Sequence, residues 1–442
     1  MSSDFQYEEE DFSSSQVNTG ILKRILGAVR PHWKWVLGFM VSIGAVSAME
    51  SFFTFLGKRI VDEGIIPRNT DALIHNLTIY GVVSVFFAMF VFAFIFLAGV
   101  LGQRVRYDLR KAVFDHLQTL SFSYFDKTPV GWIMSRVTSD TERMADLVTW
   151  GMLDVTWAVM NIVFALFFMA TINWQLMLIV LVMIPILLRV AMWFKNKILV
   201  EYREVRKINS KITGTYNENI TGVRVVKALR REEENRREFD NLAENMYRRA
   251  FRAAWLSALF LPVVQILSAL AIGAILWNGG IQVNLGTMTI GGIQAFIAYV
   301  TFMMWPVQDL ARVYSEMQQA VASAERFFSL MDSKPDIVNK PGATNPGTIR
   351  GDIEFDNVTF YYQPEKPVLT NFNLKVKRGE TIALVGPTGG GKSTTVNLIC
   401  RFYEPKEGRI LIGGEDYTNY TLEAIQSRIG VVLQTPHLFS GS

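Results

Sequence analysis

Six apolar segments of about 20 residues each constrain this chain more than any other feature, because a helix of that length spans a hydrocarbon core of about 30 Å. They lie at 35–57, 77–101, 150–171, 176–196, 256–278 and 290–311. Half of the residues are hydrophobic and the mean hydropathy is +0.22, which is too apolar for a purely soluble protein. The pattern predicts an α-helical transmembrane domain with six spans.

Charge divides the connections between these segments into two groups. The connections at 173–175 and 278–292 are uncharged, whereas those at 102–149 and 197–252 are long and basic. Because Lys and Arg are enriched on the cytosolic side of membranes, the basic connections are predicted to be cytosolic and the uncharged ones to face outside. Helical periodicity with mixed charge in the basic connections predicts that the membrane helices continue as long rods into the cytosol.

The N-terminal residues 1–20 are acidic and contain no apolar run, so they predict a cytosolic tail rather than a secretory signal. In the next ten residues, 21–30, apolar side chains share one helical face, and Lys23, Arg24 and Arg30 share the other. This pattern fits a helix lying in the membrane interface and equally fits an ordinary amphipathic helix.

Charge and cysteine content exclude further classes of protein. The formal net charge is only +4, so nothing in the overall composition indicates a nucleic-acid partner. The chain has one cysteine, Cys400, which rules out an intrachain disulfide framework and a cysteine metal cluster.

The composition changes after the sixth apolar segment. Residues 333–350 are rich in Pro, Gly, Asn and Lys and predict a linker, and 351–442 predict a soluble domain. Within it, 351–363 and 368–380 alternate apolar and polar residues as half-buried strands do, while 381–386 form a short continuous apolar run typical of a strand buried on both faces.

A phosphate-binding motif, G-x-x-x-x-G-K-[ST], follows that run and precedes a helical stretch, as the motif requires. Glycines let backbone N–H groups converge on phosphate oxygens, the lysine supplies a positive charge to the β- and γ-phosphates, and the serine hydroxyl can ligate Mg²⁺. The alternative is a glycine-rich turn with a chance lysine. The motif predicts ATP and Mg²⁺ as cofactors of a partial α/β P-loop nucleotide-binding domain. The predicted binding residues are Gly386, Pro387, Thr388, Gly389, Gly390, Gly391, Lys392, Ser393 and Thr394.

With these motifs in place, the sequence resembles the ATP-binding-cassette exporters, in which permease and ATPase are fused, over nearly its whole length. The segment VTFYYQ resembles the adenine-stacking loop of that family and implies that Tyr362 stacks on the base, with Tyr361 as the competing candidate. The alternative is a strand aromatic that packs on the sheet. The segment IGVVLQTPHLF is similar to the Q-loop and implies that Gln434 reaches Mg²⁺ and the attacking water. Without the resemblance, it would be an ordinary loop glutamine.

The membrane part carries the same resemblance. The segments SFSYFDKTPVGWIMSRVTSD and YNENITGVRVVKALRREEENRREF resemble the two cytosolic loops that dock on ATPase domains, and VASAERFFSLMD resembles the end of the sixth helix. Each segment alone could be a solvated charged helix. Together they imply an exporter domain over 21–332, outward transport by alternating access and a second half-transporter subunit, identical or similar. They also imply a hydrophobic or amphipathic substrate, such as a drug or a lipid.

The signature loop, the Asp-Glu pair and the switch histidine of this family would lie beyond Ser442. The sequence as printed is therefore expected to bind nucleotide weakly and not to hydrolyse it alone, and no general base is assigned. The expected location is a bacterial cytoplasmic membrane, with both termini and the nucleotide-binding domain in the cytosol.

Glu50 lies inside the first apolar segment, where an ionised carboxylate is costly unless it faces water or a partner. It is a candidate for the substrate path, and the alternative is a carboxylate paired for packing. Arg189 is expected at the cytosolic end of the fourth segment, and Pro185 and Pro306 are expected to kink helices at most.

Three other functions compete with this interpretation. A nucleotide-gated channel or regulatory membrane protein would use ATP only as a ligand, and substrate-stimulated ATP hydrolysis would argue against it. A soluble P-loop enzyme is disfavoured by the six spans. A peptide-processing exporter is disfavoured because only about twenty residues precede the amphipathic helix, whereas its family normally carries an N-terminal cysteine peptidase domain.

Overall fold

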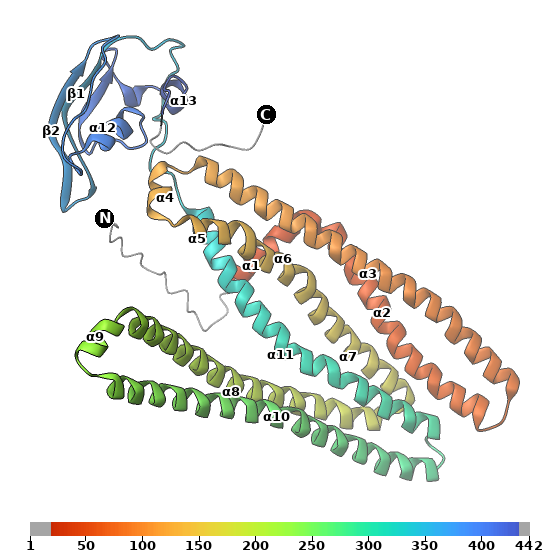
Figure 1. The fold of residues 1–442 in the computed structure, drawn as a ribbon. Coiled ribbons are helices and arrows are strands. Elements are labelled where there is room, and N and C mark those ends of the chain that lie inside the picture. Colours follow the sequence, from red (N-terminus) through yellow and green to blue (C-terminus); the bar gives the residue numbers. More distant parts are fainter. Residues whose placement is uncertain (1–18, 433–442) are drawn as a thin grey trace. The chain divides into compact units, whose positions relative to one another are not determined.

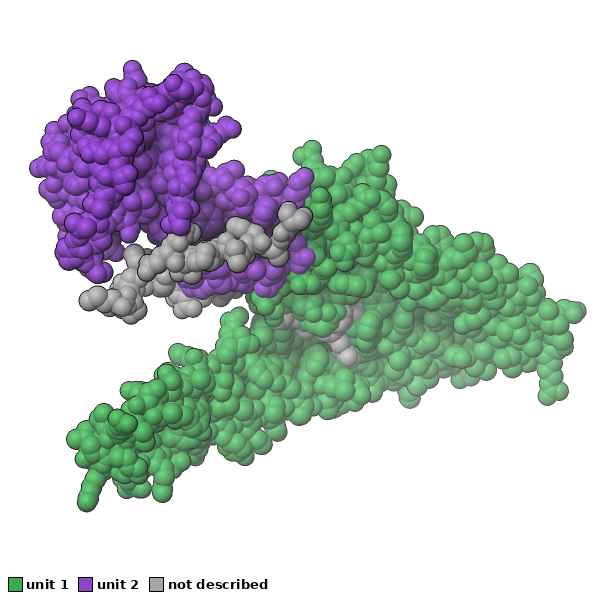
Figure 2. All heavy atoms as spheres, turned by 45° about the horizontal axis from the view of Figure 1, so that its top comes forward, with its two compact units in different colours: residues 1–108, 142–325 green, residues 109–141, 326–442 purple. Residues whose placement is uncertain are grey.

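The computed structural model describes residues 19–432, without the side chains of 19, 306–311, 314 and 315. The chain divides into two compact units (Figure 2). Unit 1 comprises 1–108 and 142–325, and unit 2 comprises 109–141 and 326–442. The basic connection 102–149 therefore contributes residues 109–141 to the same unit as the part of the chain after residue 325.

Long helices make up most of unit 1 (Figure 1). They are α1 Thr19–Val29, α2 Trp33–Arg59, α3 Thr70–Thr119, α7 Met152–Ile172, α8 Trp174–Thr221, α10 Glu232–Asn284 and α11 Ile290–Asp332, of which α3 and α11 continue into unit 2. Shorter pieces connect them: η1 Arg30–His32, η2 Ile60–Ile65, α4 Phe122–Lys127, α5 Val130–Ser135, η3 Arg136–Asp140, α6 Thr141–Asp146, η4 Leu147–Gly151 and α9 Val223–Ala228.

Among the described residues, five helical stretches are long and apolar enough to cross a membrane, and the apolar stretch Ile290–Trp305 of α11 is a shorter sixth. The helical transmembrane fold is thus confirmed. The prediction of long rods is also confirmed, because α10 has 53 residues. At about 1.5 Å per residue it is about 80 Å long, far beyond the thickness of a bilayer core.

One predicted connection is wrong. The uncharged stretch 278–292 was expected to be a loop, yet α10 continues to Asn284 and only 285–289 are non-helical. The glycine pair Gly279-Gly280 lies within the helix. Gly279 is buried, and a Cβ there would lie 3.1 Å from the side chain of Ile293, so close packing of α10 on α11 outweighs the weak helix propensity of glycine.

The core of unit 1 lies between α7, α8, α10 and α11. Its fully buried members share the inward faces of these four helices and include Met169, Leu176, Ile275 and Phe296. Tyr299 of α11, also fully buried, donates its hydroxyl to the Ser51 carbonyl of α2 at 2.7 Å. Helix α2 is thereby linked to the same bundle.

Unit 2 contains an antiparallel sheet of four strands in the order β2-β1-β3-β4: β1 Ile353–Gln363, β2 Lys366–Val376, β3 Glu407–Ile412 and β4 Glu415–Asp416. The two segments of alternating apolar and polar residues form the antiparallel hairpin β1–β2. A bulge lies within β1, where Asn357 has a φ of 52°, so that Phe355 and Val358 both face the core. Gly408 fits against the bulge because a Cβ there would lie 2.3 Å from the Asn357 carbonyl oxygen.

One face of this sheet is covered by helices. Phe355, Phe360 and Ile410 of the strands pack with Leu398 of α12 Lys392–Ile399 and with Ile425 of α13 Leu422–Gln426. Near α13, the 3₁₀ turn η5 Tyr417–Asn419 adds the fully buried Tyr417. This small core holds the start of α12, where the phosphate motif ends.

The predicted buried strand at 381–386 is wrong for this structure. These residues belong to no strand, and Val385 is 87% exposed. The apolar run 429–432 before Gln434 is likewise outside any strand, and Val432 is fully exposed. A strand needs neighbours for its N–H and C=O groups, and the four strands of the described sheet do not pair with either run.

Candidate functional site

The phosphate motif forms a loop that leads directly into α12. Gly391 is the N-cap residue and has a φ of 80°, a left-handed conformation that glycine adopts without strain. A Cβ at this position would also lie 2.8 Å from a methyl group of Leu369. No side chain caps the helix, so the N–H groups of its first turn remain available to an anion, which the positive end of the helix also attracts.

Lys392 folds back over this loop. Its ammonium donates hydrogen bonds to the carbonyl oxygens of Gly386 at 2.9 Å and Pro387 at 2.8 Å. The next residue, Ser393, is exposed, and Thr394 is buried. The lysine and the serine hydroxyl therefore lie on the accessible side of the loop, and Thr394 lies on its packed side.

Tyr362 lies beside the loop. Its hydroxyl is 3.3 Å from the Thr394 hydroxyl, its ring meets Tyr403 edge-on with centroids 5.1 Å apart, and it remains 44% exposed. Tyr361 points to the other face of β1, since successive strand residues alternate, and lies under the ammonium of Lys406. Of the two tyrosines, Tyr362 is the one next to the loop, and adenine stacking on it stays a prediction.

The described residues fit a nucleotide with Mg²⁺. Phosphate requires hydrogen-bond donors and positive charge, which the uncapped start of α12 and the Lys392 ammonium supply. Mg²⁺ requires oxygen ligands, and the exposed Ser393 hydroxyl is one. Lys392 and the loop N–H groups would hold phosphate oxygens, and Ser393 would ligate the cation. Gln434, the other predicted metal and catalytic residue, lies outside the described residues.

The connection that follows α3 contacts the residues just after α12 within unit 2. Phe122 of α4 stacks on Phe402 with ring centroids 5.2 Å apart, and Asp126 accepts a hydrogen bond from the Tyr403 hydroxyl. Burial and Asp126 both raise the pKa of Tyr403, so the phenol stays protonated. The sequence indicated that this connection docks on an ATPase domain, but it did not identify these side chains.

The linker is fastened to unit 2 along its length. The Ile337 N–H donates to the Ser121 hydroxyl at 3.0 Å, the Asn339 side chain accepts from the Leu422 N–H at 2.7 Å, and the Thr344 N–H donates to the Asn419 carbonyl at 2.9 Å. It has no helix or strand, as its composition indicated. These bonds nevertheless make it part of the folded unit rather than a free tether.

A buried ion pair fixes the end of α11 to the same connection. Asp140 is 1% exposed and receives two hydrogen bonds from Arg326, at 2.6 and 3.1 Å. A carboxylate in such a position needs this partner, because an unpaired buried charge costs several kcal/mol. The sequence singled out Arg326 only as part of a resemblance to the end of the sixth helix, and Asp140 had no signal of its own.

Comparison with known proteins matches both parts of the chain. A family model described as "ABC transporter transmembrane region" matches residues 21–307, and a second model described as "ABC transporter" matches residues 369–442. The chain belongs to the ABC transporter family. One chain therefore carries an ABC transporter transmembrane region followed by a segment that matches the second ABC transporter model.

Bacterial relatives resemble this ABC transporter along most of its length. An ABC transporter ATP-binding protein of Bacillus subtilis, YknV, is 30% identical over 99% of this chain and 73% of its own length. An ATP-dependent lipid A-core flippase of Syntrophus aciditrophicus is 33% identical over 95% of this chain and 70% of its own. A putative multidrug export protein of Bacillus subtilis, YgaD, is 31% identical over 95% and 74%.

In the helical part of this transporter, Glu50 is embedded in a polar cluster between α2 and α7. Its Oε2 accepts hydrogen bonds from the Trp157 indole at 3.1 Å and the Asn161 amide at 2.9 Å. The buried hydroxyls of Ser47, one turn before Glu50 on α2, and of Ser51, the next residue, have no hydrogen-bond partner among the described residues. The sequence identified Glu50 but missed Asn161, although an amide inside an apolar span is itself a signal for a polar site.

Proposed function

We propose that this ABC transporter is an ATP-driven exporter that moves a hydrophobic or amphipathic molecule, a lipid or a drug, across a bacterial cytoplasmic membrane. The observation that carries the proposal is the open phosphate loop with Lys392, on the same chain as helices long enough to span a bilayer. The relatives named as a lipid A-core flippase and a multidrug export protein support the substrate class.

The proposed organisation follows the sequence boundaries. Residues 21–332 form the transmembrane domain, 333–350 the linker and 351–442 the nucleotide-binding domain. The charge distribution of the connections supports an orientation with both termini and the nucleotide-binding domain in the cytosol.

The chain's own residues define the first steps of the nucleotide cycle. Lys392 exchanges the carbonyls of Gly386 and Pro387 for phosphate oxygens, and the first-turn N–H groups of α12 donate to them as well. Mg²⁺, when bound, balances phosphate charge beside Ser393. Tyr362 covers the base, and Gln434 is proposed to position the attacking water.

Coupling to the membrane is proposed to run through the contact of α4 with the end of α12. A shift at the phosphate loop moves α12, which ends at Ile399, and Phe402, three residues farther along the chain, stacks on Phe122. The connection that carries Phe122 continues without a break from α3, which also belongs to unit 1. A bistable transport cycle requires such a continuous path, since nucleotide can act only through contacts that differ between two states.

A second subunit, identical or similar, is proposed to complete the transporter. The tip of the α8–α10 hairpin supports this, because α9 and its flank expose apolar side chains there, with Val225 61% and Leu229 64% exposed. An apolar helix tip beside the charged start of α10 suits docking on another folded surface. The nucleotide-binding domain of the partner is the proposed surface.

The first test measures nucleotide binding and turnover in lipid nanodiscs. Lys392→Ala should weaken binding of a fluorescent ATP analogue in the presence of Mg²⁺ by at least about tenfold, because one charge-assisted contact contributes about 1.5–3 kcal/mol. Arg378→Ala, an exposed basic residue before the loop, is the matched control and should bind as the wild type does. If the Lys392→Ala and wild-type proteins bound the ATP analogue with equal affinity, the phosphate loop would not be the nucleotide site.

ATP turnover by the full-length transporter separates transport from gating. An amphipathic compound that stimulates ATP hydrolysis in the wild type, but not in Lys392→Ala, supports an exporter and identifies its substrate class. Tight nucleotide binding without any stimulated turnover in the assembled dimer would favour ATP as a regulatory ligand of a channel.

A further inference from the structure

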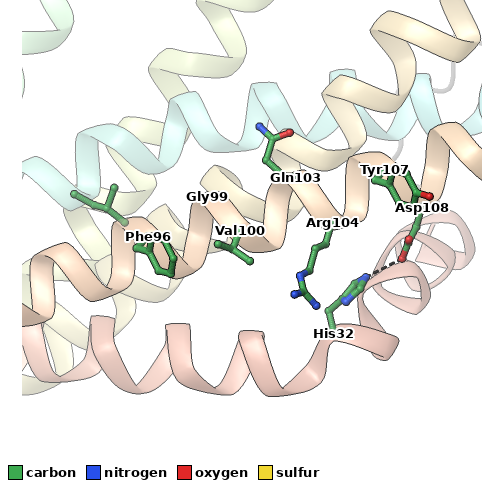
Figure 3. A pocket seen from close by; sticks show the side chains of 9 residues that line it. His32, Phe96, Gly99, Val100, Gln103, Arg104, Tyr107 and Asp108 are labelled. Carbon is green, nitrogen blue, oxygen red and sulfur yellow. Dashed lines mark hydrogen bonds and ion pairs between the residues drawn. The ribbon is translucent and has the colours of Figure 1, made fainter.

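A groove with a volume of about 680 Å³ opens between the beginning of α2 and the outer side of α3 (Figure 3). Its walls come from η1 on one side and from residues 95–108 of α3 on the other. All of these residues belong to unit 1. Neither the nucleotide site nor the polar cluster at Glu50 shares a residue with it.

One end of the groove is apolar. Ile95, Phe96 and Val100 line it, and Phe96 is 55% exposed. Gly99 leaves this end open, because no other atom lies within 4 Å of the position that a Cβ would take. An acyl chain or a similar hydrocarbon can therefore lie along this side of α3 without displacing any side chain.

The other end is polar and carries an unmatched positive charge. His32 and Asp108 pair with each other, with the imidazole Nε2 2.8 Å from the carboxylate. Arg104 lies between them and the apolar end, with its guanidinium 4.5 Å from the ring centroid of Trp35 (Figure 3). No carboxylate among the described residues forms an ion pair with Arg104.

The polar end lies at the depth expected for lipid headgroups. The apolar span of α3 ends near Leu101, so Arg104 is within one turn of the end of the span. Trp33 and Tyr107 are exposed beside it, and tryptophan and tyrosine gather where hydrocarbon meets headgroups. From Phe96 to Arg104 the helix rises about 12 Å, which matches a ligand with a charged head and an apolar chain.

From this arrangement we infer that the groove is a binding site for an anionic phospholipid of the inner leaflet. The headgroup phosphate binds the Arg104 guanidinium, and an acyl chain lies along Phe96 and Val100 past Gly99. The Asp108 carboxylate is held 2.8 Å from the His32 imidazole and forms no ion pair with Arg104, so the guanidinium stays available to the phosphate. This lipid is a resident partner of the helical part, separate from the transported substrate.

The experiment compares lipid adducts by native mass spectrometry of the whole transporter released from detergent. The protein is equilibrated with equal amounts of phosphatidylglycerol and phosphatidylcholine. The wild type should retain the anionic lipid several-fold over the zwitterionic one. Arg104→Ala should lower the phosphatidylglycerol adduct at least about tenfold, as expected for loss of a charge-assisted contact.

Two further variants separate the groove from general charge effects. Arg110→Ala removes an exposed arginine farther along α3 that does not line the groove, and it should keep the wild-type preference. Gly99→Leu fills open space and should lower adducts of both lipids, while the melting temperature stays unchanged. The proposed site would be ruled out if the Arg104→Ala protein kept the wild-type amount of phosphatidylglycerol adduct. It would also be ruled out if Arg104→Ala and Arg110→Ala lowered that adduct equally. Adducts confined to monomers and missing from dimers would rule it out as well, because they would mean that a second copy covers the groove.

Discussion

At the scale of single residues, the candidate functional side chains of this transporter contact neighbours on one side and are accessible or next to unpaired polar groups on the other. Lys392 rests on two carbonyls of its own loop, which phosphate oxygens can replace. Glu50 has one oxygen bound by Trp157 and Asn161 and lies next to buried hydroxyls. Arg326 differs from both. It donates two hydrogen bonds to the Asp140 carboxylate, so its role is structural.

Glu50→Gln tests whether the carboxylate acts on substrate. The amide oxygen of glutamine can still accept from Trp157 and Asn161, so the packing of α2 on α7 should persist while the negative charge is lost. Transport of cationic amphiphiles should fall at least about tenfold, the effect of removing one charged contact, and transport of neutral lipids should not change. The measurement is uptake into inverted vesicles.

Glu63→Gln is the control, because Glu63 is paired with Arg59 at the end of the same helical stretch. Undiminished transport of every cationic compound by the Glu50→Gln protein would assign Glu50 to packing alone.

At the scale of elements, the helices form as their sequence period indicates, and the strands form only where partners exist. The alternating segments become the β1–β2 hairpin, because each supplies the hydrogen-bonding edge of the other. The apolar runs at 381–386 and 429–432 have strand composition but no strand partner in the described sheet, and apart from Ile429 their side chains remain exposed. Strand propensity thus depends on neighbours far away in the sequence.

Phe122→Ala tests the element contact proposed to carry coupling. The variant removes the ring stacked on Phe402, and an aromatic pair contributes about 0.5–1.5 kcal/mol beyond its buried area. Nucleotide affinity should stay within about twofold, whereas substrate stimulation of ATP hydrolysis should fall by about fivefold or more, since 1 kcal/mol corresponds to about fivefold.

Phe125→Ala on the same short helix is the matched control, because its ring packs on Tyr124 rather than on the α12 side. Full stimulation in the Phe122→Ala protein would place coupling elsewhere.

At the scale of the whole molecule, the two compact units do not follow the order of the sequence. Residues 109–141, which connect two membrane helices, belong to the unit that holds the phosphate loop. Residues 109–141 belong to this unit because they contact the chain around residues 326–336. The Ser123 hydroxyl donates to the Asp336 carboxylate at 2.5 Å, and Arg326 forms an ion pair with Asp140. The other basic connection, with α9 at its tip, belongs to unit 1 and exposes apolar side chains.

Val225→Asp tests whether that tip docks on a second subunit. Because Val225 is exposed in the single chain, the melting temperature should hardly change, as is usual for surface substitutions. A carboxylate buried in a subunit contact is costly, so the dimer dissociation constant should rise by at least about tenfold. Mass photometry in nanodiscs measures the dimer fraction.

Thr213→Asp puts the same charge on an exposed position of α8, away from the tip, and should leave dimers intact. A Val225→Asp protein that dimerises as the wild type does would contradict docking through α9.

The sequence by itself determined the membrane-spanning helices, their extension beyond the bilayer, the β1–β2 hairpin and the phosphate loop, because each depends on local period or on a contiguous motif. Only the tertiary structure decided the rest. It placed Tyr362 rather than Tyr361 beside Thr394, joined Asp140 to Arg326, surrounded Glu50 with Trp157 and Asn161, and left 381–386 without a strand. These features depend on contacts between residues far apart in the chain, which local pattern cannot specify.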